Sequence, residues 1–288
     1  MMIINSRLDT DLYKLTMWKY VKEYAPDINV TYQFICRNKD AQLTRYIKES
    51  ELRDELSHVR TLFFTGDELR YLSNLYIGTQ PVFSWFEANL MNACEPPAYE
   101  LRFTDDSIYL IFSGKWRDAI WWETHPAVMR SWQKLYPYEM RIDLPDTFGS
   151  EYAIEQMTRE TFDQWRGFRQ DSGDPSGFAQ ILHDRCVELG VDMKEKTLIF
   201  SDGLDVQTIV ALAEVWDHFD ISFGWGTNLT CDLLVPPISI VIKLVKSCGQ
   251  GVVKLSDTPA KAQGPPTLVG YMKKLFEYTE QKYIPTRY

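Results

Sequence analysis

The chain lacks the features that mark several classes of protein. Its five cysteines are scattered, odd in number and never in a CxxC pair, which argues against a zinc site or a disulfide framework. No apolar run approaches the ~20 residues of a membrane-spanning helix, and the longest, residues 238–245, is interrupted by Lys243. The net charge of −9 leaves little of the basic surface that strong nucleic-acid binding requires. We therefore predict neither a membrane nor a nucleic acid as partner.

The N-terminus also lacks a charged segment followed by an apolar one, so the sequence predicts no signal peptide. We expect a cytoplasmic protein, with the nucleus as an alternative location. What is present is ordinary for a globular protein, with 45% hydrophobic and 25% charged residues. A chain of 288 residues can bury a sizeable core in one or two domains.

Four segments in the second half of the chain share one design. In each, an apolar run that we interpret as a buried strand ends in a loop rich in Asp, Ser and Gly. Such loops lie at the carboxyl ends of strands, where α/β barrels build their sites. Glycine lets backbone N–H groups approach a phosphate, and acidic residues can hold a metal or a sugar hydroxyl. The pattern predicts a phosphorylated sugar as substrate. The segments are residues 167–175, 197–205, 221–227 and 252–259.

The pattern along the chain predicts two domains. Residues 1–114 mix helices and strands without strict alternation, which indicates an α+β domain. From residue 115 to 288 strand, loop and helix follow one another, which favours a parallel sheet or barrel and includes a strand at 238–245. A complete barrel usually needs about 250 residues and rarely fewer than about 200. Because residues 115–288 number only 174, we expect an open sheet or an incomplete barrel.

Short motifs distributed along the chain resemble those of one enzyme family, nicotinate phosphoribosyltransferase. The similarity begins at Leu8 to Met17 and extends through both predicted domains, and at both ends of the chain the order and spacing match those of that family. Each motif is short, but together they are specific. The other motifs are Phe34 to Arg37, Gly114 to Arg117, Trp122-Glu123, Arg169 to Pro175, Phe200 to Asp205, Phe223 to Asp232, Val241 to Val245 and Lys254 to Pro259.

The resemblance implies an α/β fold, with an N-terminal α/β sandwich followed by an irregular α/β barrel. It implies condensation of nicotinate with phosphoribosyl pyrophosphate to form nicotinate mononucleotide, a salvage step of NAD biosynthesis. In the family this step is usually coupled to ATP through a phosphorylated histidine, and Mg²⁺ neutralises the leaving pyrophosphate. The resemblance also implies a homodimer with shared active sites.

Two family segments are missing between Trp122-Glu123 and Arg169. One is an arginine-rich stretch that grips phosphoribosyl pyrophosphate, and the other is a Gly-Thr-x-Ala-His-Glu motif that carries the phosphorylated histidine. The chain has no Arg-Arg pair, and none of its four histidines is followed by Glu. We interpret this as an internal deletion near residues 128–131. The chain is then either a working enzyme or an impaired form that keeps dimerisation and partial ligand binding. A different phosphosugar-binding α/β enzyme is the third alternative.

Acidic and basic side chains in these loops are the candidates for catalysis. Displacement of pyrophosphate passes through an oxocarbenium-like centre, which negative charge stabilises. Asp171 and Asp202 are the candidate catalytic carboxylates, for the sugar hydroxyls or for the water shell of Mg²⁺; alternatively they cap the following helices, and the same choice applies to Asp174. Arg169 suits the nicotinate carboxylate because its guanidinium is a planar fork; alternatively it forms a surface ion pair.

The remaining candidates bind the ring and the phosphate. Tyr13 can stack on the pyridine, and in the resembling family this tyrosine reaches into the neighbouring chain's site; alternatively it is a core aromatic. Backbone and hydroxyl donors for the 5′-phosphate are predicted in two loops, although a lone Gly-x-Gly is usually only a turn. We predict no metal bound by the protein itself. The phosphate candidates are Ser201, Gly203, Gly224, Gly226 and Thr227.

Overall fold

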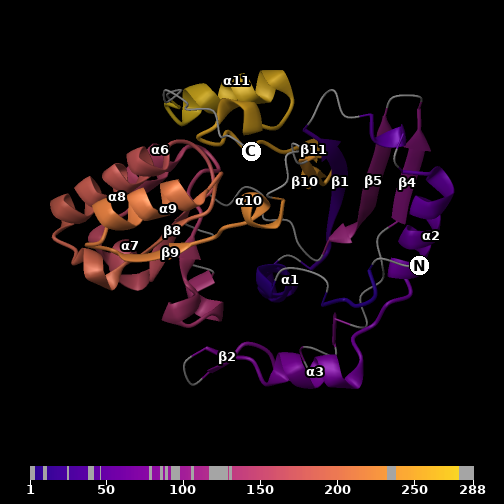
Figure 1. The fold of residues 1–288 in the computed structure, drawn as a ribbon, viewed down its shortest axis with the longest axis horizontal. Helices are drawn as coiled ribbons and strands as arrows, with labels where there is room; N and C mark the ends of the chain where they lie inside the picture. The colour runs from indigo at the N-terminus through magenta and orange to yellow at the C-terminus, as the bar shows by residue number, and fades with distance from the viewer. Residues whose placement is uncertain are drawn as a thin grey trace. The chain divides into compact units, whose positions relative to one another are not determined.

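The chain folds into two compact units, which are described separately (Figure 1). The first comprises Met1–Trp121 with Ile238–Gln250, and the second comprises Trp122–Pro237 with Gly251–Tyr288. The computed structural model describes residues 4–8, 12–24, 26–37, 42–45, 47–77, 80–84, 87, 90–91, 98–104, 107–116, 129, 132–231 and 238–278.

A five-stranded sheet forms the centre of the first unit, in the order β11-β10-β1-β5-β4. The pairs β10–β1, β1–β5 and β5–β4 are antiparallel. The strands β1, β4 and β5 confirm the predicted mixture of strands with helices in the N-terminal part of the chain. The bounds are β1 Ile28–Cys36, β4 Ala98–Phe103, β5 Ile108–Trp116, β10 Ile240–Ser247 and β11 Gln250–Gly251.

Helix α2 (Glu49–Val59) packs its apolar side on this sheet. Its Leu52 and Leu56 contact a cluster that includes the buried Leu101 and Leu110 of the sheet.

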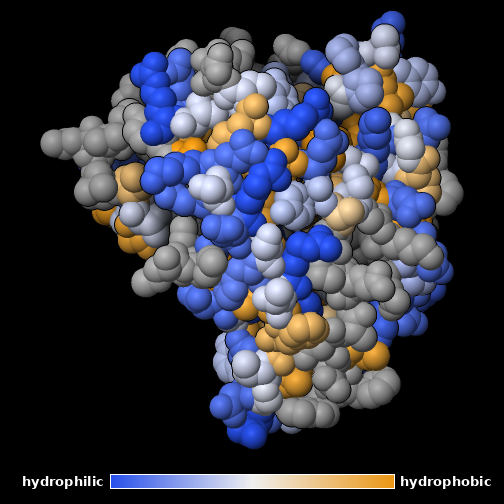
Figure 2. All heavy atoms as spheres, turned by 90° about the vertical axis from the view of Figure 1, so that its right-hand side faces the viewer, coloured by the Kyte–Doolittle hydropathy of each residue, from blue (hydrophilic) through white to orange (hydrophobic). Residues whose placement is uncertain are grey.

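On the face drawn in Figure 2, hydrophobic residues are interspersed with hydrophilic ones, as is normal for isolated exposed side chains. The other elements are α1 Leu12–Tyr24, η1 Leu43–Arg45, α3 Gly66–Ser73, β2 Tyr76–Ile77 and β3 Gln80–Pro81.

The strand predicted at 238–245 does not join the parallel sheet of the second unit, and that interpretation is wrong. It is β10, which pairs antiparallel with β1 in the first unit, for example Phe34 with Ile242 and Gln33 with Lys243. Its run of apolar and β-branched residues suits a strand of either sheet, and only the long-range partner decides between them.

The second unit is built on a parallel sheet in the order β6-β7-β8-β9. Register pairs run straight across it, from Gln170 to Phe200 and from Phe200 to Phe223. In the described part of this unit the parallel strands number four, fewer than the eight of a complete barrel. The predicted α/β class is confirmed. The strands are β6 Ile142–Asp143, β7 Gly167–Gln170, β8 Thr197–Phe200 and β9 Asp220–Phe223.

The core of this unit lies between the strands and their helices. Phe168 and Leu198 of the strands and Leu182 of α8 are fully buried. Within the described ranges no helix is both long and apolar enough to cross a bilayer. The helices are α6 Ser150–Glu155, α7 Arg159–Gln164, α8 Pro175–Leu189, α9 Val206–Val215, α10 Thr227–Thr230 and α11 Pro266–Leu275, with 3-10 turns η3 Tyr138–Met140, η4 Met193–Glu195 and η5 Pro259–Lys261.

Local signals in the sequence explain where α8 and α9 begin. The Asp174 carboxylate accepts the N–H of Gly177 at 2.7 Å, and Pro175 follows it at the first helical position. Asp205 caps α9 in the same way by accepting the N–H of Thr208 at 2.7 Å. Of the two interpretations offered for Asp174, helix capping is the one that the geometry supports.

Gly167 allows β7 and β8 to approach each other. A Cβ atom at this position would overlap the carbonyl oxygen of Thr197 on β8. We expect Gly167→Ala to lower the free energy of unfolding by ~3 kcal/mol, as overpacking does at a rigid site. Gly270→Ala is the matched control, because Gly270 lies inside α11 with open space around it. It should instead raise stability by about 0.5–1 kcal/mol. Urea unfolding of both variants measures the difference, and equal effects would contradict the argument.

Candidate functional site

The sheet of the second unit brings three of the predicted loops together. Because Gln170, Phe200 and Phe223 are paired across three parallel strands, the residues that follow them, Asp171, Ser201 and Gly224, lie along one edge. The Ser201 N–H donates to the Gln170 carbonyl at 3.0 Å, and the Gly224 N–H donates to the Phe200 carbonyl at 2.8 Å. The strand ends therefore form one continuous surface, as open α/β sites require.

Arg169 is held at this edge by its neighbours. Its Nε donates to Ser201 Oγ at 2.8 Å, and its Nη2 donates to Asp171 Oδ1 at 2.9 Å. The Ser201 hydroxyl in turn donates to the Gln170 carbonyl at 2.7 Å. The arginine and aspartate side chains are 35% and 34% exposed. The ion pair foreseen for Arg169 exists, but it is part of a cluster at the strand ends that an incoming anion can reach.

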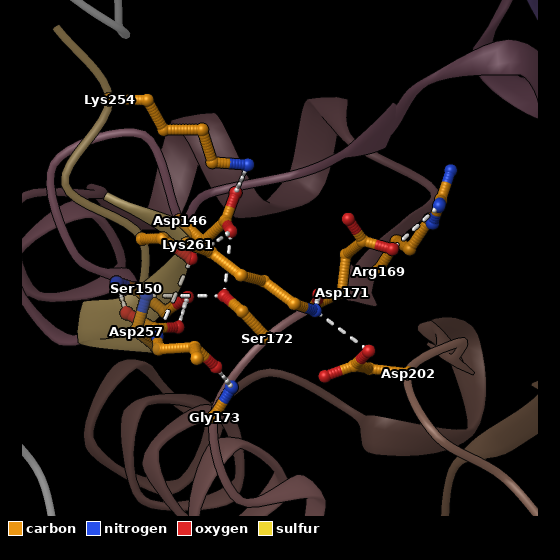
Figure 3. Close-up of polar contacts among 12 residues, drawn as sticks. Asp146, Ser150, Arg169, Asp171, Ser172, Gly173, Asp202, Lys254, Asp257 and Lys261 are labelled. Carbon is orange, nitrogen blue, oxygen red and sulfur yellow. Dashed lines mark hydrogen bonds and ion pairs between the residues drawn. The ribbon is translucent and has the colours of Figure 1, made fainter. Parts of the chain in front are cut away.

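Asp202 is paired with a lysine that our sequence interpretation left without a role. Lys261 Nζ donates to Asp202 Oδ1 at 2.7 Å and to the Asp171 carbonyl at 2.9 Å. The two charged side chains are 16% and 6% exposed, respectively. Since Asp174 and Asp205 cap the helices, Asp171 and Asp202 do not have that function. Their carboxylates lie in a cluster with two cations, Arg169 and Lys261 (Figure 3).

Two further carboxylates are buried beneath this cluster. Asp146 receives Lys254 Nζ at 2.7 Å and the hydroxyls of Ser172 and Ser256 at 2.6 and 3.3 Å. Asp257 accepts the N–H of Ser150 at 2.8 Å and also its hydroxyl. Burial raises the pKa of the Asp257 carboxyl above its ordinary value, and the nearby Asp146 raises it further.

The fourth predicted loop reaches the site without a parallel strand before it. We expected a strand at 252–256, but within 252–258 only Lys254 forms a β-bridge, to Gln263. The segment is held instead by backbone bonds, from Leu255 N–H to the Thr147 carbonyl at 2.7 Å and from Ser256 N–H to the Asp146 carbonyl at 3.1 Å. The strand prediction is wrong there because the segment makes separate backbone bonds to the loop after β6 and to Gln263 rather than a ladder with a neighbouring strand.

The predicted phosphate donors occupy the loops after β8 and β9. Gly203 has φ +62°, a left-handed conformation that favours glycine. A Cβ on Gly224 would crowd Ser201 at 2.9 Å, so the two loops approach closely there. Gly226 precedes α10, and Thr227 is the exposed first residue of that helix. These positions share the strand-end region with Arg169, and their role in binding phosphate stays a prediction.

Tyr13 lies in α1 of the first unit, but its side chain is outside the described residues. Its proposed stacking on the pyridine stays a prediction. The deletion point predicted near 128–131 also falls almost entirely outside the described residues, as does the Trp122-Glu123 motif.

The sequence interpretation missed Asp146 and Ser150, which support the site from below. A signal existed: after the short strand β6, the residues 146–150 read Asp-Thr-Phe-Gly-Ser, the same kind of loop as the four recognised ones. The strand has only two residues, so its apolar run is too short to predict a strand from the sequence.

Comparison with known proteins gives consistent results for both halves of the chain. A model of the nicotinate phosphoribosyltransferase (NAPRTase) family matches residues 107–280, and a model of the family's N-terminal domain matches residues 8–128. A nicotinate phosphoribosyltransferase from Ralstonia pickettii (strain 12J) is 27% identical over 388 residues, covering 96% of this chain and 99% of the relative.

Solved structures agree on the fold. The nicotinate phosphoribosyltransferase of Porphyromonas gingivalis has a TM-score of 0.82 at 20% identity and covers 96% of this chain and 100% of its own. The nicotinate phosphoribosyltransferase of Vibrio cholerae has a TM-score of 0.84 at 21% identity, and the match covers 96% of this chain and 94% of the Vibrio chain.

The alignment with the Ralstonia relative also bears on the missing segments. It spans 388 residues, whereas this chain has 288, so a hundred or more aligned positions have no counterpart here. An internal deletion, as predicted from the sequence, would produce an alignment of this kind, because both ends of the two chains would still match. With one family model matching well over half of the residues and a second matching the N-terminal part, the chain belongs to the nicotinate phosphoribosyltransferase family.

Proposed function

We propose that this chain joins nicotinate to the ribose of phosphoribosyl pyrophosphate. The pyridine nitrogen forms a bond to C1 of the ribose while the bond from C1 to the pyrophosphate oxygen breaks, giving nicotinate mononucleotide and pyrophosphate. The observation that carries the proposal is the cluster of Arg169, Asp171, Asp202 and Lys261 at the carboxyl ends of the parallel strands. Family membership supports the same reaction.

The charges of the cluster suit this chemistry. Asp171 and Asp202 provide negative charge for the positive centre that develops at C1 when pyrophosphate departs. Arg169 and Lys261 hold these carboxylates in place, so little reorganisation is needed during the reaction. Gly203, Gly226 and Thr227 of the neighbouring loops remain the candidate donors to the 5′-phosphate, which backbone N–H groups bind well, whereas the N–H groups of Ser201 and Gly224 already donate to backbone carbonyls.

Mg²⁺ fits this site as a partner of the substrate rather than of the protein alone. Among the described residues no group of three or more His, Cys, Asp or Glu side chains could hold a metal ion. Mg²⁺ usually keeps several waters and binds through one or two carboxylates together with substrate phosphates. Asp171 and Asp202 would serve it in that way, and the ion would neutralise charge on the leaving pyrophosphate.

Three further features of the protein are part of the proposal and rest on the resemblance. ATP is the family's co-substrate. A homodimer would let Tyr13 of one chain reach the neighbouring site. The cytoplasm is the proposed location, because the substrates are small metabolites.

Arg169→Ala tests the proposed substrate. Only two of the five guanidinium N–H donors are used by Ser201 and Asp171, and the side chain is 35% exposed, so donors remain for a carboxylate. Its loss should weaken nicotinate binding, measured by calorimetry, by about 1.5–3 kcal/mol, the scale of a charge-assisted hydrogen bond.

Arg166→Ala is the matched control. Arg166 pairs with Asp220 at 2.6 Å and is similarly exposed, but it precedes β7 at the opposite end of the sheet. Nicotinate affinity should be unchanged in this variant. Equal affinity for wild type and Arg169→Ala would remove Arg169 from the site.

A further inference from the structure

We propose that Asp257 is a positioning residue for the site: by holding the first residue of α6, it fixes the loop that places Lys261 between Asp171 and Asp202. The inference concerns the position of Lys261, and only its consequence for phosphoribosyl pyrophosphate rests on the proposed function. Asp257 itself belongs to the layer beneath the strand-end cluster and is 7% exposed.

Asp257 is anchored on the first residue of α6. The residue before this helix is Gly149, which has φ +106° and no side chain with which to cap the helix. The Asp257 carboxylate replaces the missing cap from 107 residues away, because it accepts both the N–H and the hydroxyl of Ser150. A carboxylate at the N-terminus of a helix is favoured by the unpaired N–H groups there. The loop is thereby tied to α6 by directional bonds.

Hydrogen bonds also fix the segment between Asp257 and Lys261, which lies four residues further along the chain. The Asp257 N–H donates to Ser172 Oγ at 3.1 Å, and Thr258 Oγ1 accepts the N–H of Gly173 at 3.0 Å. The Lys261 N–H then donates to the Thr258 carbonyl at 2.8 Å, closing the turn η5. Asp257 and Thr258 are thus bonded to Ser172 and Gly173, and Lys261 lies in the turn that follows, so the position of the lysine depends on where Asp257 is held (Figure 3).

The base of the loop, where Lys254 meets Gln263, is also fixed. Lys254 and Gln263 exchange backbone hydrogen bonds at 3.0 and 2.8 Å on either side of the turn. Between them Ser256 has φ +64°, a left-handed conformation that is strained for a residue with a side chain. Its backbone is held there from both sides, by the Asp146 carbonyl and by the hydroxyl of Tyr278, which donates to the Ser256 carbonyl at 2.7 Å. Strain maintained in this way is typical of segments whose shape serves a site.

Asp257 places a carboxylate at a buried position. Burying a charged group is costly, and apolar packing of the same volume is often at least as stabilising. A carboxylate offers what packing does not, namely two acceptors that fix both the distance and the direction of their donors. Asp257 uses them on two donors of one residue, Ser150. The two hydrogen bonds therefore fix the position of the loop rather than add much to the free energy of unfolding.

The test measures the exposure of Lys261 without any substrate. Trace acetylation with acetic anhydride followed by mass spectrometry reports the relative rate for each lysine, with the highly exposed Lys48 as internal reference. Asp257→Asn keeps the shape of the side chain but removes its charge. We expect Lys261 to be acetylated roughly tenfold faster in this variant, the scale of one charge-assisted hydrogen bond. Ser150→Ala, which removes only the hydroxyl donor, should give a smaller increase.

Two control variants separate positioning from general loosening of the fold. Asp192→Asn makes the same substitution at the cap of η4, far from Lys261 in the chain, and should leave its acetylation unchanged. Leu182→Ala disturbs the core of the same unit without touching the loop. Wild-type acetylation of Lys261 in both Asp257→Asn and Ser150→Ala would overturn the inference. So would an equal increase in Leu182→Ala at a temperature where both proteins are folded.

A second measurement shows the consequence for substrate. In calorimetry with Mg²⁺ present, Asp257→Asn should weaken binding of phosphoribosyl pyrophosphate roughly tenfold, while nicotinate affinity, which we attribute to Arg169, stays within about twofold. Unchanged affinity for phosphoribosyl pyrophosphate would overturn the positioning role. If wild type binds no phosphoribosyl pyrophosphate, the proposed function fails, and acetylation alone then decides whether Asp257 positions Lys261.

Discussion

The purified chain should form nicotinate mononucleotide at a rate that ATP does not increase, and it should acquire no acid-labile phosphate. In the family that this chain resembles, ATP acts through a phosphorylated histidine in a Gly-Thr-x-Ala-His-Glu motif, and no histidine of this chain is followed by Glu. The arginine-rich segment that would neutralise pyrophosphate is missing as well. Because the loss of one preorganised donor commonly costs about 10²–10³ in rate, we expect turnover far below that of a relative that retains both segments.

The assay supplies nicotinate, phosphoribosyl pyrophosphate, Mg²⁺ and labelled ATP. The positive control is a family member that carries both the arginine-rich stretch and the Gly-Thr-x-Ala-His-Glu motif. It should show ATP-stimulated product formation under the same conditions. Robust stimulation by ATP in this chain, or a phosphoprotein that is stable to base and labile to acid, would show that the deletion does not remove the coupling.

Phe168→Ala should lower the free energy of unfolding of the second unit by about 3–5 kcal/mol, the usual cost of removing a large buried aromatic side chain. Phe168 is fully buried in β7, and its ring centroid lies 5.0 Å from that of Phe162. Domains are stable by only about 5–15 kcal/mol in total, so much of the unit's stability would be lost. The same strand carries Arg169 and precedes Asp171, so nicotinate binding should weaken as the unfolded fraction grows.

Urea denaturation monitored by circular dichroism measures this effect. Val187→Ala is the control: Val187 lies on α8 of the same unit but is 61% exposed, so its truncation should change stability by no more than about 0.5 kcal/mol. Similar midpoints for the two variants would mean that Phe168 is not part of a closely packed core.

Much of the strand-end cluster was predictable because its signals are local. An apolar run followed by Asp, Ser and Gly indicates a strand and its loop within about ten residues, and parallel strands place such loops at one edge. Arg169, Asp171 and Ser201 were identified in this way, and they are in contact with one another. Sequence alone left open whether each Asp caps a helix, because a capping Asp and a site Asp occupy the same loops; the structure assigns capping to Asp174 and Asp205.

The amino-acid sequence by itself determined the family, the α/β class and most helices and strands, because periodicity, capping residues and short motifs act over a few neighbouring residues. Only the tertiary structure decided which distant segments meet. It placed β10 beside β1 instead of in the parallel sheet, and it brought Asp257 to the N-terminus of α6 and Lys261 to Asp202. A strand can pair with any edge of suitable register, and a carboxylate or ammonium group can bind any donor or acceptor within reach. Those choices depend on the packing of the whole chain.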